Sequence, residues 1–402
     1  MATKGRNDAV RGARSTLVTG ISRLVTNDPG AGPDPLGTVS DAAVVLDGGI
    51  VAWTGPAADA PAADDSVDVG GRAALPGWVD SHTHLIFAGD RAAEFSARMA
   101  GRAYRAGGMT ATVEATREAD DAVLLDLVER RLATMCAGGT TCVETKTGYG
   151  LTVADERRAA GLAAQAGVDE ITFLGAHVVP DEYAKDRQGY LDLVCGPMLD
   201  AVREYVRWID VFCEQDAFDD AESRRVLAAG QRAGLGLRVH GNQLGTGSGV
   251  ALAVEMGAAS VDHCTYLSDD DVQALAGGDT VATLLPTADL STRQPPAPGR
   301  RLLDAGARIA LATNCNPGTS YTTSMPLVVA LAVLQCELTA EEAVWAATAG
   351  GAAALRRADV GTLRVGARAD LQVIDAPSID HIAYRLGGSR VHAVWRAGDR
   401  VV

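Results

Sequence analysis

The feature that most constrains the fold is a regular alternation of short apolar segments with longer amphipathic ones through the middle of the chain. The apolar segments read as eight buried strands: AALPGWVDSHTH, TCVETKT, EITFLGAH, IDVFCEQ, LGLRVHG, SVDHC, TVATLLP and RIALATN. Helical patterns separate several of them, such as DDAVLLDLVERRLATMCAGG, which stops at Gly138. This alternation predicts an α/β fold, a (β/α)8 TIM barrel at residues 75–356. A doubly wound sheet is the alternative, but no G-x-G-x-x-G motif opens a helix.

Two β-rich segments lie at opposite ends of the chain. Residues 15–72 carry β-branched runs broken by Gly, Asp and Pro, and the C-terminal stretches ADLQVIDAP and VHAVWRAGDRVV have the same character. We therefore expect a small β-sandwich domain formed from both chain ends, residues 1–74 and 357–402, which the chain leaves and re-enters around the barrel.

Charge and composition exclude several classes of partner. The 402 residues carry a net charge of −15, which argues against binding to nucleic acid or an anionic membrane surface. A small anionic substrate is compatible with it, since one local arginine can bind a carboxylate. The longest apolar run, LVVALAV, is too short to span a bilayer. The charged N-terminal segment lacks the apolar core of a signal peptide, and the 7 scattered cysteines suit a reducing compartment, so we expect a cytoplasmic protein.

Polar residues fall where most of the candidate strands end. They are His84, Lys146, His177, Glu214, His240, His263 and Asn314. Because the carboxyl ends of barrel strands surround one site, these side chains should meet at one mouth. Two other histidines, His381 and His392, fall in the C-terminal β segment, where a surface or packing role is expected.

The motif DSHTH is the sharpest sign of chemistry. His82 and His84 lie two residues apart on a strand and so point to the same side, where both can bind one metal ion. His240 is the expected third ligand, although a buried histidine that only completes the core is the alternative. With a group from the eighth strand, three imidazoles would hold one divalent metal and leave room for water. His177 and His263 could be ligands, proton carriers or hydrogen-bond donors, and we favour the roles that are not ligation.

Three further features suggest contacts with a substrate. Arg91 follows the first strand and could hold a carboxylate, although a solvated arginine is about equally expected from this position alone. Tyr149, in the glycine-flanked loop KTGYG, could cover a substrate or simply pack. The stretch NPGTS, residues 316–320, offers an asparagine side chain and backbone amides next to Asn314, a possible cradle for an anion or amide.

Six motifs in order resemble the imidazolonepropionase family of the amidohydrolase superfamily. They are LPGWVDSHTHLIFAGDR, ETKTGYGL, FLGAHVVP, RVHGNQLG, SVDHC and LATNCNPGTSYTTSMP, and the match runs over nearly the whole chain. The resemblance implies a (β/α)8 barrel with a small β-sandwich domain and one zinc or iron ion. It implies hydrolysis of 4-imidazolone-5-propanoate to N-formimidoyl-L-glutamate in histidine degradation, and it is compatible with a homodimer.

The same resemblance implies roles for individual residues. The metal ligands are His82, His84, His240 and, in the position of the family's aspartate, Asn314. The substrate-binding residues are Arg91 for the propionate carboxylate, Tyr104, Tyr149, His177, Gln243, Asn316, Gly318 and Thr319. The catalytic residues are His263, placed to assist the attacking water, Gln243, where many members have a glutamate, and Asn314.

Two of these positions depart from the family pattern, and both replace an acid by an amide. Gln243 can still hydrogen-bond a substrate ring. Asn314 is the larger change, because an amide coordinates only weakly through oxygen and is no base near neutral pH. If the mechanism is unchanged, a loss of roughly 10²–10⁴-fold is expected. Asn314 could be an engineered substitution that traps a complex, could mark a homologue that has lost hydrolysis, or could leave His263 or His177 as the base.

Three functions follow from these observations. The first is an impaired imidazolonepropionase-like hydrolase. The second is a diverged amidohydrolase that acts on the C–N bond of another cyclic amidine, azole or lactam in specialised metabolism. The third is a catalytically dead homologue that binds a ligand. The first is favoured because the histidines, Arg91 and Tyr149 are all present.

Overall fold

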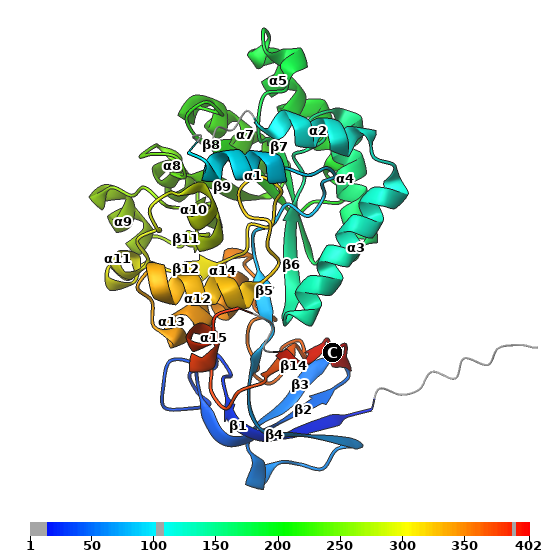
Figure 1. The fold of residues 1–402 in the computed structure, drawn as a ribbon, viewed down its shortest axis with the longest axis vertical. Helices are drawn as coiled ribbons and strands as arrows, with labels where there is room; N and C mark the ends of the chain where they lie inside the picture. The colour runs from blue at the N-terminus through cyan, green and yellow to red at the C-terminus, as the bar shows by residue number, and fades with distance from the viewer. Residues whose placement is uncertain (1–13, 102–107, 388–390) are drawn as a thin grey trace, which may run out of the picture.

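The computed structural model describes residues 14–101, 108–387 and 391–402 and divides into a barrel and a smaller β unit (Figure 1). The barrel strands are β5 (Trp78–Asp80), β6 (Thr140–Lys146), β7 (Glu170–Ala176), β8 (Trp208–Cys213), β9 (Gly236–Gly241), β10 (Ser260–His263), β11 (Val281–Leu284) and β12 (Ile309–Leu311). They form an eight-stranded parallel sheet in chain order. The predicted TIM barrel is therefore confirmed, and all eight predicted strands contribute to it.

Most of the helices surround this sheet (Figure 1). The helices are α1 (Ala92–Met99), α2 (Met109–Glu118), α3 (Asp121–Ala137), α4 (Val153–Gln165), α5 (Arg187–Leu193), α6 (Leu199–Val202), α7 (Asp220–Arg232), α8 (Gly249–Glu255), α9 (Asp269–Ala276), α10 (Pro286–Thr292), α11 (Gly299–Asp304), α12 (Met325–Gln335), α13 (Ala340–Trp345), α14 (Gly351–Ala354) and α15 (Asp380–Tyr384). Helix α3 ends at Gly138 as its sequence predicts, and α13 begins with a capping box between Thr339 and Glu342. Within the described residues, no helix is both long and apolar enough to cross a membrane.

The barrel closes where its first and last strands meet. The backbone N–H of Asn314 donates to the His82 carbonyl at 3.0 Å, and that of His84 donates to the Cys315 carbonyl at 2.9 Å. Asp80, fully buried, accepts hydrogen bonds from the backbone and hydroxyl of Thr313 at 3.1 and 2.6 Å. This seam places position 314 directly beside the two histidines of the DSHTH motif.

The small unit takes strands from both chain ends. Its seven-stranded sheet has the order β15-β14-β13-β4-β1-β2-β3. The strands are β1 (Thr16–Leu24), β2 (Val39–Asp47), β3 (Ile50–Pro56), β4 (Asp65–Pro76), β13 (Leu371–Ile374), β14 (Val391–Arg396) and β15 (Asp399–Arg400). Strand β4 joins the halves, since it pairs in parallel with β1 and antiparallel with β13. It runs to Pro76, so the chain passes directly from this sheet into the first barrel strand.

An ionic cluster joins the small unit to the barrel away from the mouth. Asp169, just before β7, accepts hydrogen bonds from Arg368 at 2.6 Å and Arg396 at 3.1 Å. Both arginines also donate to the Thr141 carbonyl at the start of β6. The small sheet thus packs near the amino ends of the strands, and the carboxyl ends are left to form the site.

Asp289 on α10 makes a pH-dependent contribution to stability. Its carboxylate accepts from the Thr265 hydroxyl at 2.8 Å and the Ala297 backbone at 3.2 Å, and burial raises its pKa to about 7. The folded state therefore holds this proton more tightly than the unfolded state, and the stabilisation present below about pH 4 is lost as the pH rises through 7. Between pH 5 and 8 the parent chain should lose roughly 2–3 kcal/mol more stability than Asp289→Asn, measured by urea denaturation. An equal loss in both chains would contradict this.

Candidate metal and substrate site

A cavity lies at the carboxyl ends of the barrel strands. Its walls are His84, Arg91, Met109, Tyr149, His177, Phe212, His240, Gln243, His263, Asn314, Asn316 and Thr319. Most of the residues expected at the site are therefore brought together. His82 lies beside them in the group of three histidines, and Gly318 lies against Arg91. Tyr104, the remaining expected residue, lies outside the described residues.

The cavity is small in this structure. Its volume is about 30 Å³. Arg91 and Gly318 also line a larger groove of about 660 Å³ beside α1 and α10.

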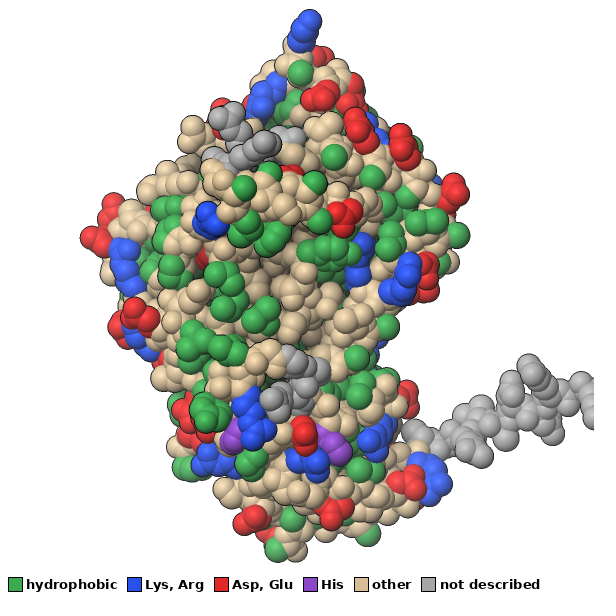
Figure 2. All heavy atoms as spheres, in the orientation of Figure 1, with side chains coloured by type: hydrophobic (Ala, Val, Ile, Leu, Met, Phe, Trp, Pro, Cys, Tyr) green, Lys and Arg blue, Asp and Glu red, His purple; other side chains and the backbone are tan. Residues whose placement is uncertain are grey.

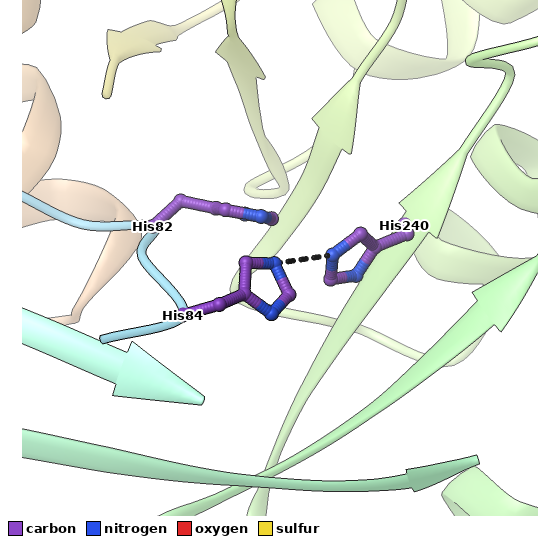
Figure 3. A group of neighbouring side chains, drawn as sticks. All are labelled: His82, His84 and His240. Atoms are coloured by element: carbon purple, nitrogen blue, oxygen red, sulfur yellow. Dashed lines mark hydrogen bonds between the residues drawn. The ribbon is translucent and has the colours of Figure 1, made fainter. Parts of the chain in front are cut away.

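Three imidazoles form a group that could hold a metal ion. His82 and His84 come from the segment after β5 and His240 from β9, and all three turn toward one another (Figure 3). One nitrogen of each lies within 4.8 Å of the others, and Nε2 of His84 is 3.4 Å from Nε2 of His240. All three side chains are buried.

The hydrogen bonds of two of these rings prepare them for a metal. Nδ1 of His82 lies 2.6 Å from the Asp262 carboxylate, and Nδ1 of His240 lies 3.1 Å from the Asp210 carboxylate. An ionised carboxylate only accepts, so each Nδ1 carries the proton and each Nε2 is left with a lone pair. Nε2 of His82 is buried with no partner among the described residues. An orphaned buried lone pair beside two imidazole nitrogens fits a divalent metal ion.

The charges around the rings support the same assignment. Burial lowers the pKa of His82 well below its usual range, so its ring is neutral. Burial alone would raise the pKa of Asp262, but the Arg238 guanidinium and His82 hold it well below the usual carboxyl range. For Asp210 too, burial alone would raise the pKa, and His240 and Lys146 lower it. Neutral imidazoles beside ionised carboxylates are the state in which histidine binds a metal.

Asn314 lies at the closing seam with left-handed backbone geometry, at φ 51°. Its side-chain oxygen accepts a hydrogen bond from Nδ2 of Asn316 at 3.1 Å, and its Nδ2 donates to the Thr319 hydroxyl at 3.4 Å. Asn316 also accepts from the backbone N–H groups of Gly318 and Thr319 at 2.8 Å. The 314–319 segment is therefore a hydrogen-bonded loop on the wall of the cavity, with an uncharged group at position 314.

His263 and His177 are the other two histidines of the cavity. His263 ends β10 at φ 85°, which is unusual for a residue with a side chain, and its Nδ1 is buried with no partner among the described residues. Nδ1 of His177 donates to the Gly148 carbonyl at 3.0 Å, which leaves Nε2 as an acceptor. Burial lowers the pKa of His263 well below its usual range and that of His177 to about 3. Both rings are therefore neutral, and each can accept a hydrogen bond through its unprotonated nitrogen.

Arg91 is more constrained than its sequence position indicates. It is almost fully buried, and Nε and Nη2 each donate to the Glu94 carboxylate at 2.7 Å. A Cβ added to Gly318 would lie 2.4 Å from Nη1 of Arg91, so this glycine is what allows the guanidinium to lie against the loop. Glu94 fixes one edge of the guanidinium and leaves the Nη1 side next to the 316–319 backbone.

Glu156 is a residue of the site that sequence reasoning missed. From α4 it accepts hydrogen bonds from the backbone N–H groups of Gly148, Gly150 and Leu151 at 3.0, 2.8 and 2.8 Å. It thereby shapes the loop that carries Tyr149, whose ring lies 5.3 Å from that of His177. A glutamate in the first turn of a helix that follows a glycine-rich loop is the sequence signal that could have identified it.

A set of buried charges lies beneath the histidines, and sequence reasoning missed all of them but Lys146, which was expected at the mouth and lies inside the barrel instead. The strands place Glu144, Lys146, Asp210, Arg238 and Asp262 inside the barrel, each with no exposed surface. The available signal was an ionisable residue inside an apolar strand, as in IDVFC and SVDH. Glu214, at the end of β8, accepts from the backbone N–H of Gln243 and so holds the loop on which that residue faces the cavity.

Comparisons with known proteins give concordant results. The model of the amidohydrolase family matches residues 73–401. The imidazolonepropionase of Saccharopolyspora erythraea is 63% identical over 391 residues, which cover 96% of this chain and 99% of that protein. The imidazolonepropionase of Micrococcus luteus is 59% identical over 407 residues, covering 97% and 100%. These identities extend over both the barrel and the small sheet.

Solved structures of similar fold are more distant in sequence. A triazine hydrolase variant superposes with a TM-score of 0.75 at 20% identity, covering 97% of this chain and 95% of that one. An adenosine deaminase from Xanthomonas campestris with bound zinc gives a TM-score of 0.70 at 21% identity, covering 96% and 92%. These likenesses concern the fold, a barrel with an appended sheet.

Proposed function

Because the chain belongs to the imidazolonepropionase family of the amidohydrolases, we propose that it hydrolyses 4-imidazolone-5-propanoate to N-formimidoyl-L-glutamate. The observation that carries the proposal is the three-histidine group, with two rings oriented by carboxylates, at the wall of a cavity that Arg91 also lines. Water adds to the ring carbonyl carbon, and the bond from that carbon to the ring nitrogen breaks. The carbonyl becomes a carboxylate, and the formimidoyl group stays on the other nitrogen.

The proposed metal site consists of His82, His84 and His240, with Asn314 as a weak oxygen ligand. A divalent metal bound there would polarise the ring carbonyl and lower the pKa of water. Asp262 and Asp210 hold the protons on Nδ1 of His82 and His240, so the Nε2 lone pairs stay directed at the ion. The proposal includes a single zinc or iron ion, because the family resemblance implies one and the donor set suits either.

The remaining residues bind and orient the substrate. Arg91 faces the propionate carboxylate, and Asn316, Gly318 and Thr319 hold the other side of the molecule. Tyr149 covers the substrate ring, and Nε2 of His177 accepts a hydrogen bond from that ring. Gln243 can donate or accept at a ring nitrogen, but unlike a glutamate it does not carry protons.

Asn314 makes the proposed hydrolase slow. No carboxylate is available at 314 to accept the proton of the attacking water. In our proposal His263, whose buried Nδ1 has no partner among the described residues, takes this proton. Burial lowers its pKa well below the usual range, so it is a weak base, and this adds to the slowness. No observation favours a different azole or lactam as substrate, or a role confined to binding.

The wider setting follows from the same family membership. We place the chain in histidine degradation in the cytoplasm, with a small anionic substrate and a homodimeric assembly. Net charge −15 supports the absence of a nucleic-acid role, and on the face shown in Figure 2 basic and acidic side chains are interspersed.

The test is to incubate the metal-loaded chain with freshly prepared 4-imidazolone-5-propanoate and to identify the product by mass and NMR. Formation of N-formimidoyl-L-glutamate above the rate of spontaneous hydrolysis supports the proposal. A rate equal to that of the buffer blank, with metal bound and other cyclic amidines also tried, would refute hydrolysis by this site.

Arg91→Lys is expected to raise KM by roughly 10–100-fold, since a lysine cannot offer the two-pronged hydrogen bonds that a guanidinium gives a carboxylate. The control is a change in the substrate: an imidazolone without the propionate arm should be turned over equally by both proteins. A KM that rises equally for the two substrates would mean that Arg91 shapes the loop and does not bind the arm.

A further inference from the structure

Lys146 is a buried cation that the proposed chemistry leaves without a role. It lies on β6 inside the barrel with no exposed surface. Its Nζ is 3.0 Å from the Glu144 carboxylate, 2.9 Å from that of Asp210 and 3.7 Å from that of Asp262. A charge is kept away from water in this way only at a large desolvation cost, which its partners must offset.

Two of these three carboxylates are the ones that orient imidazoles. Asp210 accepts from His240, and Asp262 accepts from His82. The partners come from β8 and β10, and β9, which carries His240, lies between these two strands. Lys146 faces both carboxylates from the β6 side. One ammonium is thus shared by the acceptors of two proposed metal ligands that are far apart in the chain.

Arg238, the other cation of this buried set beneath the histidines, does not make the same connection. Arg238 donates to Asp262 at 3.2 Å, but its remaining contacts are with backbone carbonyls of Ser81 at 2.7 Å and Ala354 at 3.1 Å. Among the ion pairs formed by the described residues, Lys146 alone joins both Asp210 and Asp262. Three carboxylates against two cations leave the buried set with one negative charge beneath the histidines.

We propose that Lys146, Asp210 and Asp262 form a clamp that fixes the tautomers of His82 and His240 and so presents both Nε2 lone pairs to one metal ion. The clamp rests on the proposed function only in requiring that these imidazoles hold a metal. Lys146 is the positioning residue at its centre. It keeps both carboxylates turned toward the histidines, although neither carboxylate lines the proposed substrate cavity.

A purely structural ion cluster would have a different signature. If Lys146 only balanced charge in the core, its loss together with one carboxylate would lower stability but leave the histidine rings as they are. If it positions the carboxylates, the rings lose their single tautomer even in a folded protein without metal. The tautomer is therefore the readout that separates the two roles.

The test uses the full chain with 15N-labelled histidine. Lys146→Met with Glu144→Gln removes the ammonium at constant net charge, and Glu144→Gln alone is the matched control. In the metal-free parent and control, His82 and His240 should each show the proton on Nδ1 by 15N NMR. In the double variant both rings should show mixed tautomers, and zinc affinity, measured against a chelator, should be about 10–100-fold weaker than in the control.

Single tautomers in the double variant, with zinc affinity equal to that of the control, would overturn the proposal. If the double variant does not fold, Asp262→Asn provides the second test, because it should disturb the tautomer of His82 and leave that of His240 unchanged. Identical spectra for parent and Asp262→Asn would again overturn it. Neither readout requires turnover, so failure of the clamp and failure of the proposed hydrolysis are separate results.

Discussion

Asn314→Asp is expected to raise kcat for 4-imidazolone-5-propanoate by roughly 10²–10⁴-fold over the unsubstituted chain when both are loaded with metal. This gain corresponds to about 3–5 kcal/mol of transition-state free energy. A carboxylate at this position can accept the proton of the attacking water and neutralise part of the metal's charge. The amide can do neither near neutral pH.

The structure indicates that the aspartate would fit with only a turn of the Thr319 hydroxyl, which now accepts from Nδ2 of Asn314 and would donate to the new oxygen. Position 314 has φ 51°, a region that asparagine and aspartate tolerate better than other residues with side chains. Nδ2 of Asn316, 3.1 Å from the present side-chain oxygen, would donate equally well to a carboxylate. The backbone hydrogen bond from position 314 to the His82 carbonyl is unaffected by the change, so the new oxygen stays beside the metal ligands.

Asn316→Asp is the matched control, because it makes the same amide-to-acid change two residues away on the same loop. It should not raise kcat. If neither Asn314→Asp nor Asn316→Asp has a higher kcat than the parent, another group accepts the proton of the attacking water. The residue at position 314 would then not be what limits the rate of this site.

His240→Ala is expected to abolish metal binding and to lower kcat by about 10³-fold or more, since a bound metal contributes several kcal/mol to such a reaction. The imidazole is buried, its Nε2 lies 3.4 Å from that of His84, and its Nδ1 is held by Asp210. Metal content by elemental analysis and turnover should fall together. The remaining two imidazoles cannot complete a catalytic site.

The control for this change is His392→Ala, which removes an exposed imidazole from β14 in the small sheet. Its metal content and kcat should match those of the parent. A full complement of metal in His240→Ala, or undiminished turnover without it, would show that His240 is a core histidine and that the ion is held by other groups.

The barrel could be predicted because eight apolar strand patterns follow one another, helical patterns separate several of them, and most of them end in a polar residue. DSHTH identified two imidazoles on one face because side chains alternate along a strand, and the strand-end rule then brought His177, His240 and His263 to the same cavity. These inferences need only local periodicity and one rule about where barrel sites form.

Contacts that depend on register between distant strands could not be predicted. Asp262 reaches His82 across 180 residues of sequence, and Lys146 reaches Asp210 from a strand that is not adjacent to β8. The pairing of Arg91 with Glu94 was within helical reach but was not predicted. The sequence indicates which residues are polar, whereas only the fold determines which of them meet.

The measurement that tests the central claim most directly is a metal titration of turnover. The chain is stripped with a chelator, zinc is added in steps, and loss of 4-imidazolone-5-propanoate is followed at each step. The account predicts a rate near zero without metal that rises linearly and levels off at one equivalent per chain, with N-formimidoyl-L-glutamate as product. The same rate before and after zinc, or none at full occupancy, would contradict it.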